Sequence, residues 1–62
     1  MSQIAIKRKE KGITQIELAN LIGVTQANIS AWENGIAFPT SDKLPKLAKI
    51  FGCTIDELYR KE

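Results

Sequence analysis

A short segment near the middle of the chain combines small and uncharged polar side chains at helical spacing. Its members are Gln26, Ala27, Asn28, Ser30, Ala31 and Asn34. A glutamine or asparagine amide can form two hydrogen bonds with N6 and N7 of adenine, and an alanine methyl can pack on the methyl group of thymine. The segment therefore has the chemistry to read base edges in a major groove. An ordinary solvated helix face has a similar composition, so the neighbouring residues must decide between the two interpretations.

The sequence offers little for catalysis or metal binding. It contains no histidine, which removes the commonest general base and metal ligand. The single cysteine, Cys53, allows neither an intramolecular disulfide nor a cysteine metal cluster, and we interpret it as a small buried hydrophobe. There is also no Gly-rich phosphate loop and no nucleophile–base pair. We therefore expect a binding domain rather than an enzyme, with no cofactor and no metal. Cysteine usage and the lack of a signal-peptide pattern favour a cytoplasmic location.

Length and charge bound the remaining choices. A chain of 62 residues has room for one small core, so we expect a single domain over residues 1–62. Basic residues occur near both ends, but no Lys or Arg lies between Gly12 and Ser41. A partner with an anionic backbone is allowed by this layout. Lys7, Lys9 and Lys11 are most simply interpreted as a solvated face.

A Gly-apolar-Thr tripeptide occurs three times, as Gly12-Ile13-Thr14, Gly23-Val24-Thr25 and Gly52-Cys53-Thr54. Glycine can end a helix in the left-handed conformation, and threonine can cap the start of the next helix. Glu17 and Glu57 each follow a threonine by three residues, which completes a capping box. The pattern predicts an all-α fold of five short helices, over about residues 3–11, 15–22, 26–34, 44–51 and 55–60. The helix that ends at Phe51 begins near Asp42–Leu44, because Pro45 fits only the first turn.

The second and third expected helices are joined by only three residues, Gly23-Val24-Thr25. A connection this short forces a sharp crossing, and it leaves the third helix projecting from the domain. Ile29 and Trp32 would then face the core, with the polar segment described above on the opposite side. Taken together with the family resemblance described next, this arrangement favours base reading over a plain solvated face.

Here the sequence resembles the Cro/CI-type helix-turn-helix family, the XRE-type domains of phage repressors. The resemblance runs from Ile4 to Tyr59 without a gap. It rests on residues 14–19, 23–26, 29–30, 33–35, 39, 44, 47–48 and 56–58. It implies a compact five-helix, lambda-repressor-like domain, with the helix-turn-helix unit at about residues 14–34. It also implies binding to double-stranded operator DNA, usually as a homodimer, in a transcriptional regulator that is most often a repressor.

The resemblance also implies roles for individual residues. Gln26, Ala27, Asn28 and Ala31 are expected to contact base edges. Gln15 and Asn34 are expected to contact phosphates, although Asn34 next to Gly35 also suits a helix C-cap. Arg8 and Glu33 are expected to form an internal ion pair, which would make Arg8 structural.

One group of residues suggests a second kind of surface. Ile36 and Phe38, together with Tyr59, would form an apolar dimer surface if they are exposed side by side. The alternative function is a protein–protein interaction module, or an antitoxin-like partner, that keeps the fold but binds DNA weakly. Fold alone does not separate these two functions.

Overall fold

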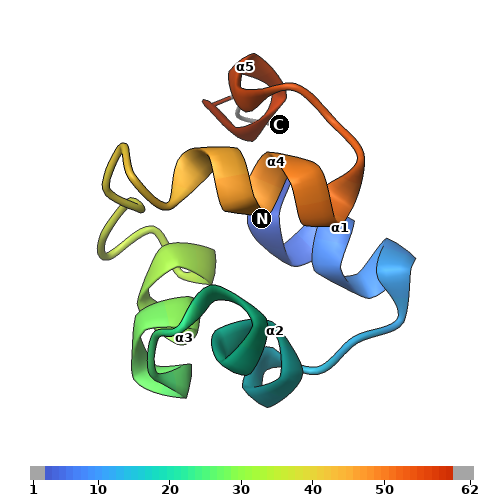
Figure 1. The fold of residues 1–62 in the computed structure, drawn as a ribbon. Coiled ribbons are helices and arrows are strands. Elements are labelled where there is room, and N and C mark those ends of the chain that lie inside the picture. The colour runs from blue at the N-terminus through green and yellow to red at the C-terminus, as the bar shows by residue number, and fades with distance from the viewer. Residues whose placement is uncertain (1–2, 60–62) are drawn as a thin grey trace.

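Five short helices form the described part of the chain, residues 3–59, in the computed structural model (Figure 1). They are α1 (Gln3–Lys11), α2 (Gln15–Ile22), α3 (Gln26–Glu33), α4 (Leu44–Phe51) and α5 (Ile55–Tyr59). No strand occurs within these residues, and the all-α prediction is confirmed. None of the five is long and apolar enough to cross a membrane. The third helix ends one residue earlier than expected, because Asn34 (φ −92°, ψ 2°) is its C-cap. Arg60, the expected end of the last helix, lies outside the described residues.

The threonine caps set where three of these helices begin. The Thr14 hydroxyl accepts a hydrogen bond from the Glu17 backbone N–H at 3.1 Å, and the Glu17 carboxylate accepts one from the Thr14 N–H at 2.8 Å. Thr54 and Glu57 form the same reciprocal pair, at 3.3 and 3.5 Å. Thr25 accepts from the Asn28 N–H at 3.2 Å. Each cap satisfies backbone donors that an uncapped first turn would leave without a partner.

The helices divide into two halves around α1. Figure 1 shows α4 across the middle of the molecule with α5 above it, and α2 and α3 below. α2 packs on α3 and α4 packs on α5, whereas α1 contacts α3, α4 and α5. The first helix therefore connects the two halves.

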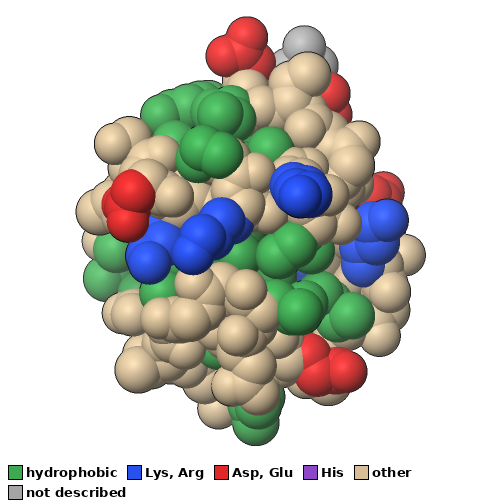
Figure 2. All heavy atoms as spheres, viewed as in Figure 1, with side chains coloured by type: hydrophobic (Ala, Val, Ile, Leu, Met, Phe, Trp, Pro, Cys, Tyr) green, Lys and Arg blue, Asp and Glu red, His purple; other side chains and the backbone are tan. Residues whose placement is uncertain are grey.

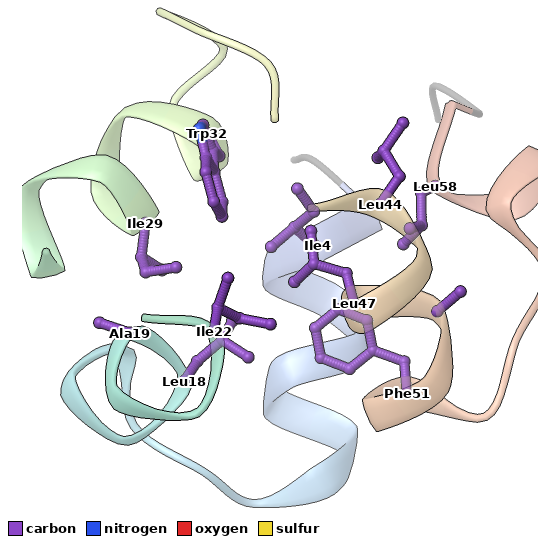
Figure 3. Close-up of a cluster of buried hydrophobic side chains, with 11 residues drawn as sticks. Ile4, Leu18, Ala19, Ile22, Ile29, Trp32, Leu44, Leu47, Phe51 and Leu58 are labelled. Atoms are coloured by element: carbon purple, nitrogen blue, oxygen red, sulfur yellow. The ribbon is translucent and has the colours of Figure 1, made fainter. Parts of the chain in front are cut away.

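The core lies between these halves and draws side chains from all five helices. Figure 3 shows Leu18, Ile22, Ile29 and Trp32 on one side facing Ile4, Leu47 and Phe51 on the other. Leu18, Ile29 and Leu47 are fully buried. Burial of each such side chain contributes about 1.5–3 kcal/mol. Ile13, Val24 and Cys53, the middle residues of the three tripeptides, are partly buried against the same cluster.

One basic residue of α1 departs from the expected solvated face. Lys7 is only 17% exposed, and its Nζ lies 3.3 Å from Oε2 of Glu57. α5 packs against α1 and carries Glu57 to this position. Lys9 and Lys11 are exposed, as expected. The interpretation of Lys7 as a solvated residue is therefore wrong, because sequence spacing within α1 does not reveal that α5 covers one side of it.

Candidate nucleic-acid interface

The turn between α2 and α3 determines how α3 projects. Gly23 adopts the left-handed conformation with φ +84°, which an L side chain adopts only with strain. The N–H groups of Gly23 and Val24 both donate to the carbonyl of Ala19, at 2.8 and 3.0 Å. Val24 is half-buried against the core, and α3 begins two residues later. The three residues from Gly23 to Thr25 are therefore sufficient to end α2 and to begin α3.

The outward face of α3 presents most of the expected base-reading residues. Gln26, Ala27 and Asn28 are exposed, and Ala31 is half-buried one turn further along. The Ala31 carbonyl accepts from the N–H of Ile36 at 2.9 Å, so the loop after α3 folds back toward this end of the helix. In Figure 2 the surface over α3 is largely free of charged side chains, and a row of basic side chains lies over α4. The exposed part of α3 therefore presents amides and methyl groups rather than charged groups.

Arg8 and Glu33 lie in direct contact behind this face. Arg8 Nε donates to Glu33 Oε2 at 2.6 Å, and Arg8 Nη2 donates to Glu33 Oε1 at 3.1 Å. The third donor, Nη1, bonds the carbonyl of Ile13 at 2.8 Å. The two side chains are only 12% and 8% exposed. The pair is bidentate, the strongest geometry for these groups, and it connects α1 to the end of α3.

The ionisation of both groups reflects this contact. The hydrogen bond to Glu33 raises the pKa of Arg8 above its usual value. Burial acts to raise the pKa of Glu33, but hydrogen bonds from Arg8 and Gln15 outweigh it and lower that pKa. Glu33 is therefore a carboxylate at neutral pH, despite its low exposure.

Two glutamines extend the ion pair toward the surface. Gln15 Nε2 donates to Glu33 Oε1 at 3.1 Å, and Gln26 Nε2 donates to Gln15 Oε1 at 3.3 Å. We call Glu33, Gln15 and Gln26 the amide relay. Sequence reasoning placed Gln15 only beside a phosphate and missed these bonds. The available signal was that each glutamine directly follows a capping threonine, so both lie at the first position of crossing helices.

Asn34 has the capping geometry that its position beside Gly35 suggested. Its backbone N–H donates to the Ser30 carbonyl at 2.9 Å, and its Nδ2 donates to the Ser30 hydroxyl at 3.2 Å. Gly35 then adopts φ +75° and turns the chain away from the helix. The Asn34 side chain is exposed, so its second N–H and its carbonyl face solvent at the end of α3.

The apolar residues after α3 form a different surface. We call Ile36, Phe38 and Tyr59, which are 80%, 45% and 56% exposed, the apolar loop surface. The rings of Phe38 and Tyr59 stack with their centroids 4.8 Å apart, and Pro39 beside them is buried. Figure 2 shows hydrophobic side chains gathered next to α5. The structure thus joins the loop to α5 at an exposed aromatic pair, with Ile36 two residues earlier on the same loop.

Comparison with curated proteins identifies relatives of this domain. The family described as helix-turn-helix matches residues 4–58. The HTH-type transcriptional activator BcrR of Enterococcus faecalis is 40% identical over 55 residues, which cover 89% of this chain and 27% of the activator. The cryptic phage CTXphi transcriptional repressor RstR of Vibrio cholerae is 40% identical over 57 residues, which cover 92% of this chain and 51% of the repressor. The chain therefore spans about a quarter of the length of the activator and about half of the length of the repressor.

Solved structures share the arrangement of helices. The P22 c2 repressor, crystallised in complex with the synthetic operator 9T, has a TM-score of 0.88 and 32% identity over 97% of this chain and 91% of that one. A transcriptional regulator from Listeria innocua has a TM-score of 0.79 and 31% identity, over 100% of this chain and 64% of that one. Both similarities extend through the five helices and are not limited to α2 and α3.

Proposed function

Because the chain belongs to the helix-turn-helix family of phage-repressor type, we propose that it is a transcriptional regulator, acting as a repressor, that binds duplex DNA sequence-specifically. One observation carries the proposal. The outward face of α3 consists of amides and methyl groups, and the inward face of the same helix supplies Ile29 and Trp32 to the core. An exposed face of this composition matches the hydrogen-bonding and methyl groups of base edges. The protein would act on the chromosome, in the cytoplasm.

The proposed docking follows from the short turn by which α2 leads into α3. α3 enters the major groove with its N-terminal residues toward the bases, and α2 lies across the backbone. Gln26, Ala27, Asn28 and Ala31 then face base edges. Gln15 and Asn34 lie at the start of α2 and the end of α3, where each retains a free N–H for a phosphate oxygen.

The test is a binding selection on a random duplex library, with wild type and Gln26→Ala compared side by side at moderate salt. We expect wild type to enrich one sequence motif and Gln26→Ala to lose the preference at one position of each half-site. The variant truncates an exposed side chain, so its fold should be unchanged by circular dichroism. A folded wild type that enriches no sequence would reject the proposal.

We further propose that the protein binds DNA as a homodimer through the apolar loop surface. An exposed cluster of this kind marks an interface more often than scattered apolar residues do. A symmetric dimer would read two half-sites about 34 Å apart, one turn of DNA. Phe38→Asp should lower operator affinity while leaving base preference unchanged, because it places a charge in the interface and alters no residue of α3. Unchanged affinity together with unchanged mass in solution would reject the dimer.

The same surface supports the second candidate function, a protein-interaction module or antitoxin-like partner. An exposed aromatic pair, with Ile36 also exposed on the same loop, is a suitable site for another protein. The selection separates the two functions. If wild type is folded and enriches no sequence, the interaction function is favoured, and Phe38→Asp becomes the variant with which to compare captured partners.

A further inference from the structure

We propose that the outward side of α4 is a second DNA-binding surface, which binds the phosphate backbone of duplex DNA of any sequence. We call Lys46 and Lys49, with Lys43 at the start of the helix, the basic row. The proposal rests on the proposed function and deepens it, because it gives the same partner a second site. Its support is the distribution of exposed positive charge around the core.

The half of the molecule made of α2 and α3 lacks the charge that sequence-independent binding requires. Non-specific affinity for DNA comes almost entirely from cations that displace counterions from phosphates. No Lys or Arg lies between Gly12 and Ser41, and Arg8 is paired with Glu33 and only 12% exposed. The amides and methyl groups of α3 suit base edges, which carry the sequence information. Binding to other sequences must therefore use cations elsewhere in the chain.

The basic row supplies such cations. Lys46 and Lys49 are exposed, α4 contains no acidic residue, and neither lysine forms an ion pair with any described residue. The two lie one turn apart on the same side of the helix, where like charges repel each other. Lys43 is half-buried and lies 3.7 Å from the Asp42 carboxylate, so it adds less. Phosphates placed against the row would relieve the repulsion between its lysines.

The basic row and the outward face of α3 point in different directions. Leu47 and Phe51 of α4 point into the core, where Figure 3 shows them facing Ile29 and Trp32 of α3. Positions 46 and 49 lie on the opposite side of α4 from its buried residues, as helical spacing requires. Figure 2 shows basic side chains in a row over α4 and a largely uncharged surface over α3. A straight duplex against the outward face of α3 would therefore leave the basic row open.

Lysine suits a contact that carries no sequence information. Its ammonium group is a compact point charge on a flexible stem, whereas arginine presents a rigid fork. The Cα atoms of Lys46 and Lys49 are about 4.5 Å apart along the helix axis, and their flexible stems can spread toward neighbouring phosphates. The domain would thus hold non-operator DNA through α4 and operator DNA through α3. A complex with operator would keep a site for a second duplex.

The first test measures, by fluorescence anisotropy, binding to a labelled duplex of random sequence from about 50 mM salt upward. Lys46→Gln combined with Lys49→Gln, the α4 pair, removes both charges. Lys9→Gln combined with Lys11→Gln, the α1 pair, removes the same net charge from exposed positions and is the matched control. We expect the α4 pair to lower affinity on the order of tenfold and to reduce the log–log salt slope by about 1.8, from roughly 0.9 per phosphate. The α1 pair should lower affinity by about threefold or less, because its charges act only at a distance.

Two results of this test would overturn the proposal. Equal losses in the α4 and α1 pairs would show that net charge alone governs the affinity. A wild type that does not bind the random duplex at about 50 mM salt would show that the domain has no such surface. Circular dichroism and a thermal melt establish that each variant is folded.

The second test asks whether the basic row is separate from the face of α3. It compares the random duplex with the operator motif recovered by the library selection. Gln26→Ala should weaken operator binding and leave the random duplex unaffected. The α4 pair should do the reverse, and it should change the operator salt slope by less than about one. If the α4 pair lowers both affinities and both slopes in the same proportion, α3 and α4 contact the same duplex and the proposal is overturned.

The third test detects the second duplex directly. Immobilised operator, just saturated with wild type, should retain a fluorescent random duplex at about 50 mM salt and release it near 200 mM. The α1 pair should retain the random duplex, and the α4 pair should not. If wild type retains none, the basic row is not available in the operator complex, and that result also overturns the proposal.

The outcomes separate this proposal from the function that it deepens. If wild type enriches no sequence but binds the random duplex through Lys46 and Lys49, the proposed sequence-specific function fails and the second surface stands. If wild type enriches a motif and the α4 pair binds the random duplex as tightly as wild type does, only the second surface is overturned.

Discussion

The two halves of the molecule are attached to α1 by neighbouring basic residues in very different ways. Arg8 holds the α2–α3 half through two bonds to Glu33, at 2.6 and 3.1 Å, with the pair 12% and 8% exposed. Lys7 holds the α5 half through one contact with Glu57 at 3.3 Å, where the carboxylate is 39% exposed. Fixed geometry is thus concentrated behind the face proposed to read DNA. A binding site needs this support, because a loosely held side chain cannot discriminate between similar partners.

The exposed surfaces of the two halves also differ in how firmly the interior holds them. On α3 the exposed Gln26 connects through Gln15 to the ion pair. On the α5 half, Phe38 and Tyr59 are exposed and stack on each other. The hydrogen bonds hold the Gln26 side chain in place before a partner binds. The exposed aromatic rings would instead be stabilised by burial, as at an interface between two copies.

The largest effect should come from the core that joins both halves. Ile29 is fully buried, whereas Ile36 is 80% exposed on the following loop. Ile29→Ala should lower the free energy of unfolding by about 4 kcal/mol through lost burial and a cavity. Ile36→Ala, the matched control, should change it by less than about 0.5 kcal/mol. Urea unfolding followed by circular dichroism would measure both, and similar losses for the two variants would contradict the burial assigned to α3.

The next effect tests the difference between the two ion pairs directly. Arg8→Met leaves Glu33 almost buried without its charged partner, and we expect a loss of about 2 kcal/mol in the free energy of unfolding, below the range for fully buried pairs. Lys7→Met should cost less, because the Glu57 carboxylate can turn to water. Unfolding curves of the two variants provide the measurement. Equal losses would show that the halves are attached with equal strength.

The helix boundaries could be predicted closely because their signals are local. A threonine, the glutamate three residues later and a glycine in the left-handed conformation act within one or two turns, and they set the bounds of α2 at Gln15–Ile22. The partial exception is the end of α3. The expected helix includes Asn34, whereas in the structure Asn34 is the C-cap that follows Glu33. Capping residues lie between two conformations, so a one-residue error there is expected.

The contacts of the candidate site could be predicted only in part. The family resemblance implied the Arg8–Glu33 pair, but not the hydrogen bonds that join Gln15 and Gln26 to it. That Gln26 and Asn28 share a face follows from helical spacing. That Gln15 reaches Glu33, 18 residues away, depends on the angle at which α2 crosses α3. The contact between Lys7 and Glu57, 50 residues apart, depends in the same way on the packing of α5. No pattern in the sequence encodes these angles, because they arise from how the whole core packs.

Acid should weaken both attachments. Hydrogen bonds lower the pKa of Glu33 against the effect of burial, and the Thr54 backbone N–H and Lys7 lower the pKa of Glu57. A carboxyl with a lowered folded-state pKa contributes stability above its unfolded pKa of about 4.3, and this is lost as pH falls through the folded value. Stability should therefore be nearly constant from about pH 7 to 5 and decline below that. Urea unfolding at several pH values would measure it. Arg8→Met should decline less steeply, and a stability that rises on acidification would contradict both assignments.

The smallest effect concerns the salt dependence of DNA binding. Arg8 is paired with Glu33, and no Lys or Arg lies between Gly12 and Ser41. The α2–α3 half, which we call the reading half, must therefore contact phosphates through amides, hydroxyls and backbone N–H groups. Such contacts release few counterions. We expect a log–log slope of affinity against salt of about −2 to −4 per protomer, from roughly 0.9 per neutralised phosphate. Exposed Lys46 and Lys49 on α4 provide the control, since replacing either by alanine should change the slope by at most about one. A slope near −10 for a dimer would show that basic residues outside the reading half supply most of the phosphate contacts. That result would contradict the proposed division of the molecule, in which one half contacts DNA through hydrogen bonds and the other half forms the dimer.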